Sequence, residues 1–383
     1  MARRTLGSRL DRNGGLGPGF DFLRVALALC VVLWHQGPIM FGAQPPETGP
    51  FATLGTAILP MFFGLSGFLI TGSALRLSLR DFLVNRGLRI FPALMVEIVL
   101  SAFVLGPIFT NLALADYLTR RQTYHYLTNI VGWVNYQLPG VFKSNPYDAV
   151  NWSLWTIPWE LGCYAAMSGF ILLGLLRRPA LIVAMNLLLM IAVVVASALR
   201  ASPTPVGGLA TQILTTPGAT LLASFLWGIA LYLYRHLIPH ALWAAALAVG
   251  LLLICAFLPG ARSMGLTIPL PFALVYLAAY VGVLPIPALP MFRRGDYSYG
   301  IYLYGAPVQQ AVRAAFPALN DAAAYLVLAL AAIVAFAAFS WHCIERPILH
   351  LRRRFSFVAR VRGVAGAEEP GVGAAAVGGE GRG

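Results

Sequence analysis

The feature that most constrains this chain is a series of about ten apolar segments, each long enough to cross a membrane. Hydrophobic residues make up 59% of the 383 residues and charged residues 11%. Lipid cannot satisfy an open backbone, and the alternating pattern of a membrane barrel is absent. The sequence therefore predicts an all-α polytopic membrane protein, a bundle of about ten transmembrane helices. The segments lie near residues 20–42, 51–73, 90–110, 152–175, 180–199, 218–234, 239–258, 267–285, 298–316 and 322–343.

The net charge of +13 is distributed unevenly among the connections between these segments. In a soluble chain it would suggest a nucleic-acid partner, but here its distribution indicates a lipid bilayer and no nucleic acid. Basic residues cluster in every second connection, which predicts a multi-pass protein of the inner (cytoplasmic) membrane with both termini cytoplasmic. Six of the 27 lysines and arginines fall on the predicted outside: Arg120, Arg121, Lys143, Arg200, Arg262 and Arg313.

Composition divides the chain into three parts. Residues 1–17 are interpreted as a cytoplasmic tail, not a cleaved signal peptide, and residues 18–350 as the membrane domain. Residues 351–383 are basic and then rich in glycine and alanine, which predicts a disordered cytoplasmic tail. The four cysteines lie in apolar runs and are interpreted as small core residues, not as a disulfide framework: Cys30, Cys163, Cys255 and Cys343.

The first apolar segment carries an arginine and a histidine, Arg24 and His35. Eleven residues of helix place them only roughly 20° apart around the axis and about 16 Å apart along it. Ionisable residues in membrane spans usually mark a pathway or a site, although a lone histidine can also fill a polar gap in a bundle. Histidine can act as a base toward a hydroxyl, and arginine can anchor a phosphate or carboxylate. Asp21, three residues before Arg24, is a possible ion-pair partner.

The third segment opens with a second pair of cations, Arg86 and Arg89. One interpretation is an ordinary anchor at the cytoplasmic membrane edge. The other is a grip on an anionic cofactor, because side chains three residues apart on a helix point the same way. Pro92 follows, where the helix can bend, and Glu97 lies deeper in the span with no obvious partner.

The run NWSLWTIPWELGCY, residues 151–164, gathers polar and aromatic side chains in the fourth segment. Its tryptophans favour an interfacial belt. Glu160 favours a site role, because a carboxylate inside a membrane is costly unless it is paired or lines a cavity. Asn151, Ser153 and Trp155 are predicted to bind substrate.

Six motifs in order carry a resemblance to a known family: FDFLRVALALCVVLWH, MFFGLSGFLIT, NRGLRIFPAL, NWSLWTIPWELGCY, YSYGIYLYGAPVQQ and IERPI. Over roughly residues 18–350 the chain resembles the membrane acyltransferase family 3, whose members O-acylate cell-surface sugars and some small molecules. The resemblance implies a ten-helix fold and an acyl-CoA donor, usually acetyl-CoA, with no metal. The sequence carries no second domain of the fused esterase-like kind, so any partner enzyme, such as a polysaccharide-assembly protein, is expected to be a separate chain.

The same resemblance implies roles for individual residues. Arg24 and His35 match the family's essential pair, Arg86 and Arg89 match its basic pair, and Glu160 matches the glutamate after the Ser-Leu-Trp motif. The chain departs from the family pattern at two positions. Trp152 stands where relatives often carry glycine, and Gly305 stands where many carry histidine. Trp152 is expected to narrow the acceptor site.

Together with this resemblance, the observations predict a membrane O-acyltransferase that moves an acyl group, expected to be acetyl, from acyl-CoA to a hydroxyl of a cell-surface glycan or glycolipid. His35, Arg24 and Glu160 are the predicted catalytic residues, with His35 as the base. Direct transfer and an acyl-enzyme on Cys30 or Ser66 both stay open. Two alternatives are acylation of a small molecule such as a macrolide, and a polytopic transporter or flippase.

Overall fold

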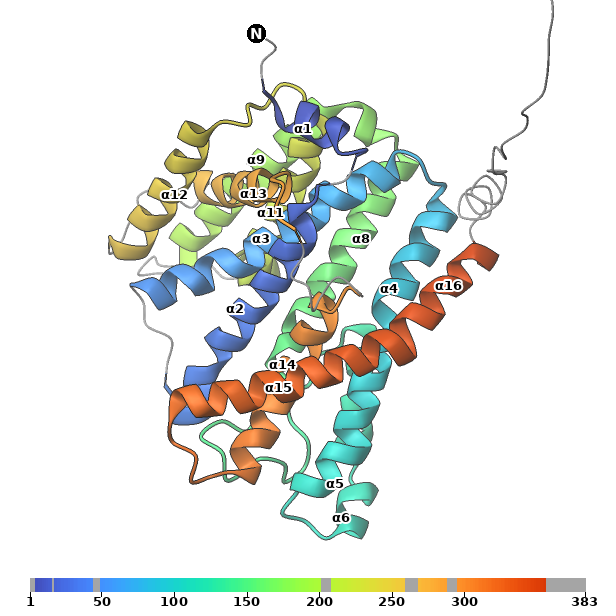
Figure 1. Cartoon of the computed structure of the whole chain (residues 1–383), viewed down its shortest axis with the longest axis vertical. Helices are drawn as coiled ribbons and strands as arrows, with labels where there is room; N and C mark the ends of the chain where they lie inside the picture. The colour runs from blue at the N-terminus through green and yellow to red at the C-terminus, as the bar shows by residue number, and fades with distance from the viewer. Residues whose placement is uncertain are drawn as a thin grey trace, which may run out of the picture.

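The computed structural model describes residues 4–15, 17–43, 49–200, 208–258, 268–287 and 295–355. Within these ranges the regular structure is helical, apart from two isolated β-bridges. The long helices form one bundle, with α1 (Leu6–Arg12) at one end and α6 (Leu114–Thr119) at the other (Figure 1). We call these ends of the molecule the α1 face and the α6 face.

Ten helices of the described residues coincide with the ten predicted segments, which confirms the all-α membrane bundle. Five of the helical spans are long and apolar enough to cross a membrane, three helices are apolar but shorter, and α8 and α14 complete the set. The bounds are α2 (Gly19–Phe41), α3 (Pro50–Ala74), α4 (Leu79–Leu100), α8 (Ile157–Leu172), α9 (Pro179–Arg200), α11 (Pro217–Leu233), α12 (Leu242–Phe257), α13 (Pro269–Gly282), α14 (Ser298–Ala315) and α15 (Ala322–Phe339).

Shorter helical elements extend or connect the long ones. Two are π-helices that continue α4 and α15, namely η1 (Ser101–Leu105) and η7 (Ser340–Glu345). The others are α5 (Gly106–Phe109), α7 (Arg121–His125), η2 (Tyr126–Val131), η3 (Trp152–Thr156), η4 (Leu175–Arg177), α10 (Leu209–Leu214) and α16 (Arg346–Phe355).

Two helices extend beyond their predicted bounds. Helix α4 begins at Leu79, well before residue 90, because the hydroxyl of Ser78 caps it by accepting a hydrogen bond from the backbone N–H of Asp81 at 3.1 Å. The basic residues of its first turns hide this start from a hydropathy analysis. At the other end, α15 continues without a break through η7 and α16 to Phe355. The remainder of the predicted C-terminal tail, from residue 356, lies outside the described residues.

Helices α3 and α11 cross at close range in the middle of the bundle. A Cβ atom added at Gly67 would lie 2.1 Å from the carbonyl oxygen of Phe225, and one at Gly228 would lie 2.0 Å from that of Gly64. Only glycine fits at these two positions, as is typical where membrane helices pack through small residues. This crossing places α3 beside the polar groups of α8 and α14.

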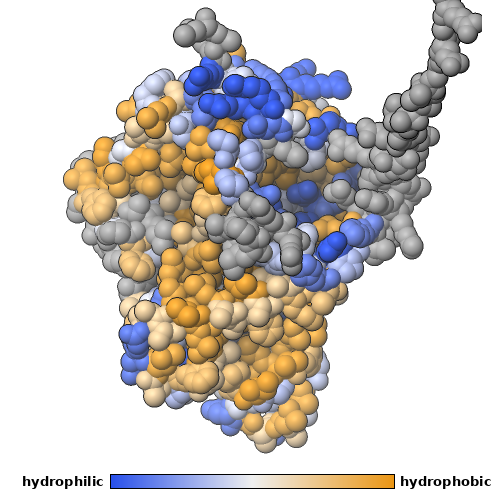
Figure 2. Space-filling view, viewed as in Figure 1, coloured by the Kyte–Doolittle hydropathy of each residue, from blue (hydrophilic) through white to orange (hydrophobic). Residues whose placement is uncertain are grey.

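The surface divides by polarity as a membrane protein requires. On the face seen in Figure 2, hydrophilic residues gather around α1 and apolar residues cover most of the rest. Helix α1 belongs to the predicted N-terminal tail, yet it is packed: Leu6 is fully buried and its backbone N–H donates to the carbonyl of Ile238 at 3.0 Å. The cysteines are free thiols. Cys163 and Cys255 are buried as predicted, Cys30 is half-buried, and Cys343 is exposed, so the core interpretation was wrong for Cys343.

The long connection between α5 and η3 closes the α6 face. Its backbone is held to the end of α5 by a hydrogen bond from the hydroxyl of Thr110 to the carbonyl of Pro139 at 2.7 Å. Gln310 of α14 holds the last part of it, donating to the carbonyls of Tyr147 and Ala149 at 2.8 Å each. These contacts fix residues 145–151 next to α2 and α14.

Candidate active site

The predicted catalytic and cofactor-binding residues lie around two cavities separated by η3. The basic cavity, about 460 Å³, is lined by Arg24, Arg86, Arg89, Glu160 and Asp296, with Ser66, Thr156, Tyr164 and Tyr302 among the other lining residues. The aromatic cavity, about 610 Å³, is lined by Trp34, His35, Gln122, Asn135, Tyr136, Gln137, Tyr147, Asp148, Ala149, Trp152 and Trp155.

In the basic cavity, one carboxylate holds two of the predicted arginines. Asp296, just before α14, lies 2.6 Å from Nη1 of Arg24 and 2.7 Å from Nη2 of Arg89. Arg89 also lies 3.5 Å from Glu345 of η7. Burial alone would raise the pKa of Asp296, but Arg24 and Arg89 hold it well below its ordinary value. The suggested partner of Arg24, Asp21, is not its ion-pair partner within the described residues.

Arg86 differs from Arg24 and Arg89 because it has no ion-pair partner among the described residues. Its Nε atom is buried without a hydrogen bond, and its guanidinium carbon lies 6.0 Å from the centre of the Tyr164 ring. An incompletely satisfied guanidinium is well suited to an anionic oxygen of a ligand. The basic cavity therefore carries a cationic group that is available to a phosphate.

Glu160 lies on the first turn of α8, in the basic cavity. Its carboxylate accepts a hydrogen bond from the hydroxyl of Tyr164 at 2.7 Å. It shares this cavity with Arg24, while His35 lines the other cavity. The structure therefore brings together two of the three residues predicted to be catalytic and separates both from the third. Ser66, one of the two possible nucleophiles, also lines the basic cavity.

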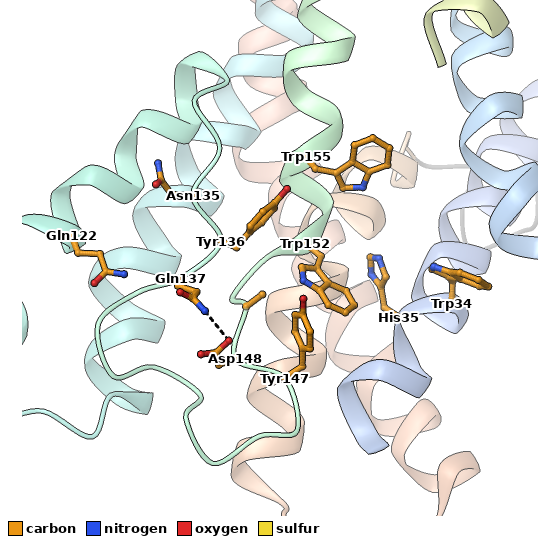
Figure 3. Close-up of a pocket in the computed structure, with 11 residues that line it drawn as sticks. Trp34, His35, Gln122, Asn135, Tyr136, Gln137, Tyr147, Asp148, Trp152 and Trp155 are labelled. Atoms are coloured by element: carbon orange, nitrogen blue, oxygen red, sulfur yellow. Dashed lines mark hydrogen bonds between the residues drawn. The ribbon is translucent and has the colours of Figure 1, made fainter. Parts of the chain in front are cut away.

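His35 lines the aromatic cavity and is 9% exposed. Its ring stands edge-on to Trp152 with 5.9 Å between ring centres, and Trp152 in turn packs against Tyr147 at 3.9 Å (Figure 3). The Nδ1 atom of His35 is buried without a hydrogen-bond partner among the described residues. An imidazole at the edge of a cavity can take a proton from a bound hydroxyl.

The connection 110–151 supplies polar lining residues that sequence reasoning did not single out. Gln137 donates to Oδ1 of Asp148 at 2.8 Å (Figure 3). Lys143 pairs with the other carboxylate oxygen. Burial raises the pKa of Asp148, but hydrogen bonds from Lys143 and Gln137 outweigh it and leave that pKa below the ordinary value. The abundance of aromatic and amide residues in this connection was the signal that could have identified them.

Helix η3 is the boundary between the two cavities. Trp155 lines the aromatic cavity and the next residue, Thr156, lines the basic cavity. The hydroxyls of Thr156 and Tyr302 are 2.7 Å apart and close the boundary at this point. Asn151 and Ser153, predicted to bind substrate, are 0% and 2% exposed and lie inside the protein, so Trp155 alone of the three borders a cavity.

The fold and this pair of cavities define a multi-pass membrane protein with a cationic site and an aromatic site on either side of one short helix. Over residues 18–343 the chain matches the acyltransferase 3 family, described as an acyltransferase domain. The protein therefore belongs to this family of acyltransferases and uses an acyl donor.

Two curated relatives support the assignment. The chain is 27% identical to an O-acetyl transferase of Shigella phage Sf6 over 313 residues, which are 76% of this chain and 85% of that protein. It is 29% identical to nodulation protein 10 of Rhizobium leguminosarum bv. viciae over 392 aligned positions, 94% of this chain and 100% of that protein. No solved structure matches the chain.

Proposed function

We propose that this protein O-acylates a hydroxyl of a cell-surface sugar, taking the acyl group from acyl-CoA in the basic cavity and delivering it to an acceptor in the aromatic cavity. The observation that carries the proposal is the placement of two cavities of opposite chemistry on either side of η3. The phage relative is an O-acetyl transferase, which favours acetyl-CoA as the donor. The acceptor is a glycan or glycolipid of the cell surface.

The donor has an anionic head, a thin pantetheine arm and a thioester. Arg86 is the first ligand for its phosphates, because no ion pair among the described residues engages it and its Nε atom has no hydrogen bond. Arg24 and Arg89 add to the positive potential of the same cavity, although Asp296 shares their charge. Glu160 lies among these groups in the basic cavity. We therefore assign it a role at the donor site and not in proton transfer at His35.

The positive-inside pattern supports a cytoplasmic position for the donor. The basic cavity is lined by the first turns of α4, whose arginines belong to a connection predicted to be cytoplasmic. The α1 face is then cytoplasmic, both termini are cytoplasmic, and the membrane is the inner one. The aromatic cavity faces the other side, where surface sugars are assembled.

The lining of the aromatic cavity suits a sugar. Aromatic rings such as Trp152 and Tyr147 offer flat apolar faces, and amides and a carboxylate such as Gln137 and Asp148 hydrogen-bond hydroxyls. Trp155 of η3 completes this surface. Asn151 acts from inside the protein, because its side chain caps η3.

The transfer step uses His35 as the base. His35 takes the proton of the acceptor hydroxyl as its oxygen attacks the thioester carbonyl. The bond between the acyl carbon and the acceptor oxygen forms, and the bond between that carbon and sulfur breaks. The proton passes from His35 to the leaving thiolate, so that free CoA and the acylated sugar are the products. For the thioester to reach His35, the contact between Thr156 and Tyr302 must open.

The experiment is mass spectrometry of surface glycans from a deletion strain, combined with transfer from labelled acetyl-CoA in membranes. The proposal expects loss of acetate from one glycan and its restoration by the wild-type gene. If a small molecule such as a macrolide is acetylated and no glycan is, the proposed acceptor is wrong and the assignment as an acyltransferase still holds. Movement of a glycan without consumption of acyl-CoA would overturn the enzyme assignment in favour of a transporter.

A further inference from the structure

Glu97 is a buried carboxylate of α4 that borders neither cavity. It is 1% exposed, and its Oε1 atom accepts hydrogen bonds from the hydroxyl of Ser101 at 2.8 Å and from the amide of Asn151 at 3.0 Å. Its Oε2 atom is buried without a partner among the described residues. A carboxylate inside a membrane protein is costly, and such residues usually serve function.

Asn151 connects Glu97 to two other parts of the site. The same amide nitrogen donates to the carbonyl of Leu303 on α14 at 3.0 Å. The side-chain oxygen accepts from the backbone N–H of Ser153 at 3.0 Å and so caps η3. Asn151 is fully buried and therefore ties α4, α14 and the first turn of η3 together.

The position of η3 matters at both of its ends. Its first residue, Trp152, packs against His35 (Figure 3). Its last residue, Thr156, shares a hydrogen bond with the hydroxyl of Tyr302 at the boundary between the cavities. A 3₁₀ helix of five residues has little stability of its own and depends on its caps and contacts. A shift at Asn151 would therefore move Trp152 relative to His35 and disturb Thr156.

We propose that Glu97 is a positioning residue for the transfer reaction. Through Asn151 it fixes η3, and η3 holds Trp152 against His35. The property required of Glu97 is an acceptor oxygen for the amide of Asn151, not a negative charge. The expected loss of transfer rate rests on the proposed function. The expected loosening of η3 does not, because it can be measured without substrate.

The test uses the full-length protein in lipid nanodiscs. The variants are Glu97→Met, which removes the acceptor, Glu97→Gln, which keeps it, and Asn151→Ala, which removes the connection. Asn186→Ala is the matched control: Asn186 is also fully buried and donates to a backbone carbonyl, that of Ala223 at 3.0 Å, between α9 and α11. Hydrogen exchange of residues 152–156 is measured without substrate, and then kcat, acceptor KM and CoA binding are measured.

Glu97→Met and Asn151→Ala are expected to speed exchange in η3 about 10-fold or more and to lower kcat by about the same factor, with CoA binding unchanged. Glu97→Gln and Asn186→Ala should resemble the wild type. Unchanged exchange in η3 would overturn the proposal, even if no activity is found for any variant. A Glu97→Gln protein as impaired as Glu97→Met would also overturn it, since the charge would then be the requirement. If Glu97→Met does not fold, Asn151→Ala decides by the same measurements.

Discussion

Arg24 and His35 lie on one face of α2 but open into different cavities. Arg24 is 2.6 Å from Asp296 in the basic cavity, and His35 packs against Trp152 in the aromatic cavity. About 16 Å of helix rise separates them. The pair therefore does not form one catalytic centre in this structure. It connects a site for the donor head to a site for the acceptor hydroxyl.

Replacing Arg86 with alanine should weaken donor use more than acceptor use. The guanidinium of Arg86 has no ion-pair partner in the described residues, and a hydrogen bond to a charged group contributes about 1.5–3 kcal/mol, so the KM for acetyl-CoA should rise about 10- to 100-fold. Arg80→Ala is the control, because Arg80 is exposed and borders neither cavity. Steady-state transfer in membranes gives both constants. An unchanged KM for the donor would remove Arg86 from the donor site.

Asp296 should stabilise the fold by a constant amount between pH 5 and pH 8. Its pKa is held well below the ordinary value of about 3.9. Stability from a carboxylate with a lowered pKa is present above its unfolded pKa and is lost only as the pH falls through the folded value. Asp296→Asn should therefore lower Tm by a similar margin at pH 5, 6, 7 and 8. Thermal unfolding of the purified proteins measures this margin, and its disappearance by pH 5 would contradict the ionised pair.

Trp152→Ala should act on the acceptor and leave the donor unaffected. The substitution removes a ring that packs against Tyr147 and His35 and widens the aromatic cavity. The KM for the acceptor should rise about 10-fold, and bulkier acceptors should be used relatively better. Trp133→Ala is the matched control, because Trp133 is 68% exposed in the connection that precedes η3. A larger effect on donor KM than on acceptor KM would show that the cavities are assigned the wrong way round.

The membrane orientation can be tested with reporter fusions. Fusions after Gly72, Arg178 and the C-terminus should report the cytoplasm, and a fusion near Lys143 should report the other side, because arginines occupy every second connection. Lys143 lies in the connection that closes the aromatic cavity, paired with Asp148. A C-terminus on the same side as Lys143 would contradict the topology.

Much of the fold follows from the sequence because membrane helices are long and apolar. The start of α4 was missed since Arg80, Arg86 and Arg89 make its first turns polar, although the Ser78 cap was visible in principle. The spacing of Arg24 and His35 fixed their separation along one helix. It did not reveal that each would open into its own cavity.

The partners of the site residues were harder to predict because they come from distant parts of the chain. Asp296, which holds Arg24 and Arg89, follows Arg24 by hundreds of residues, and no local pattern connects them. Glu97 had no obvious partner in the sequence but accepts a hydrogen bond from Asn151 in the structure. Such long-range contacts follow from how the helices pack.

His35 is the residue on which the transfer chemistry depends most. The measurement is acyl transfer from labelled acetyl-CoA in membranes that contain His35→Gln or the wild type at equal protein level. Glutamine keeps hydrogen-bonding capacity but cannot act as a base at neutral pH, so the rate should fall by about 10² to 10⁴ with CoA binding unchanged. Transfer near the wild-type rate by His35→Gln would contradict the role of His35 as the base.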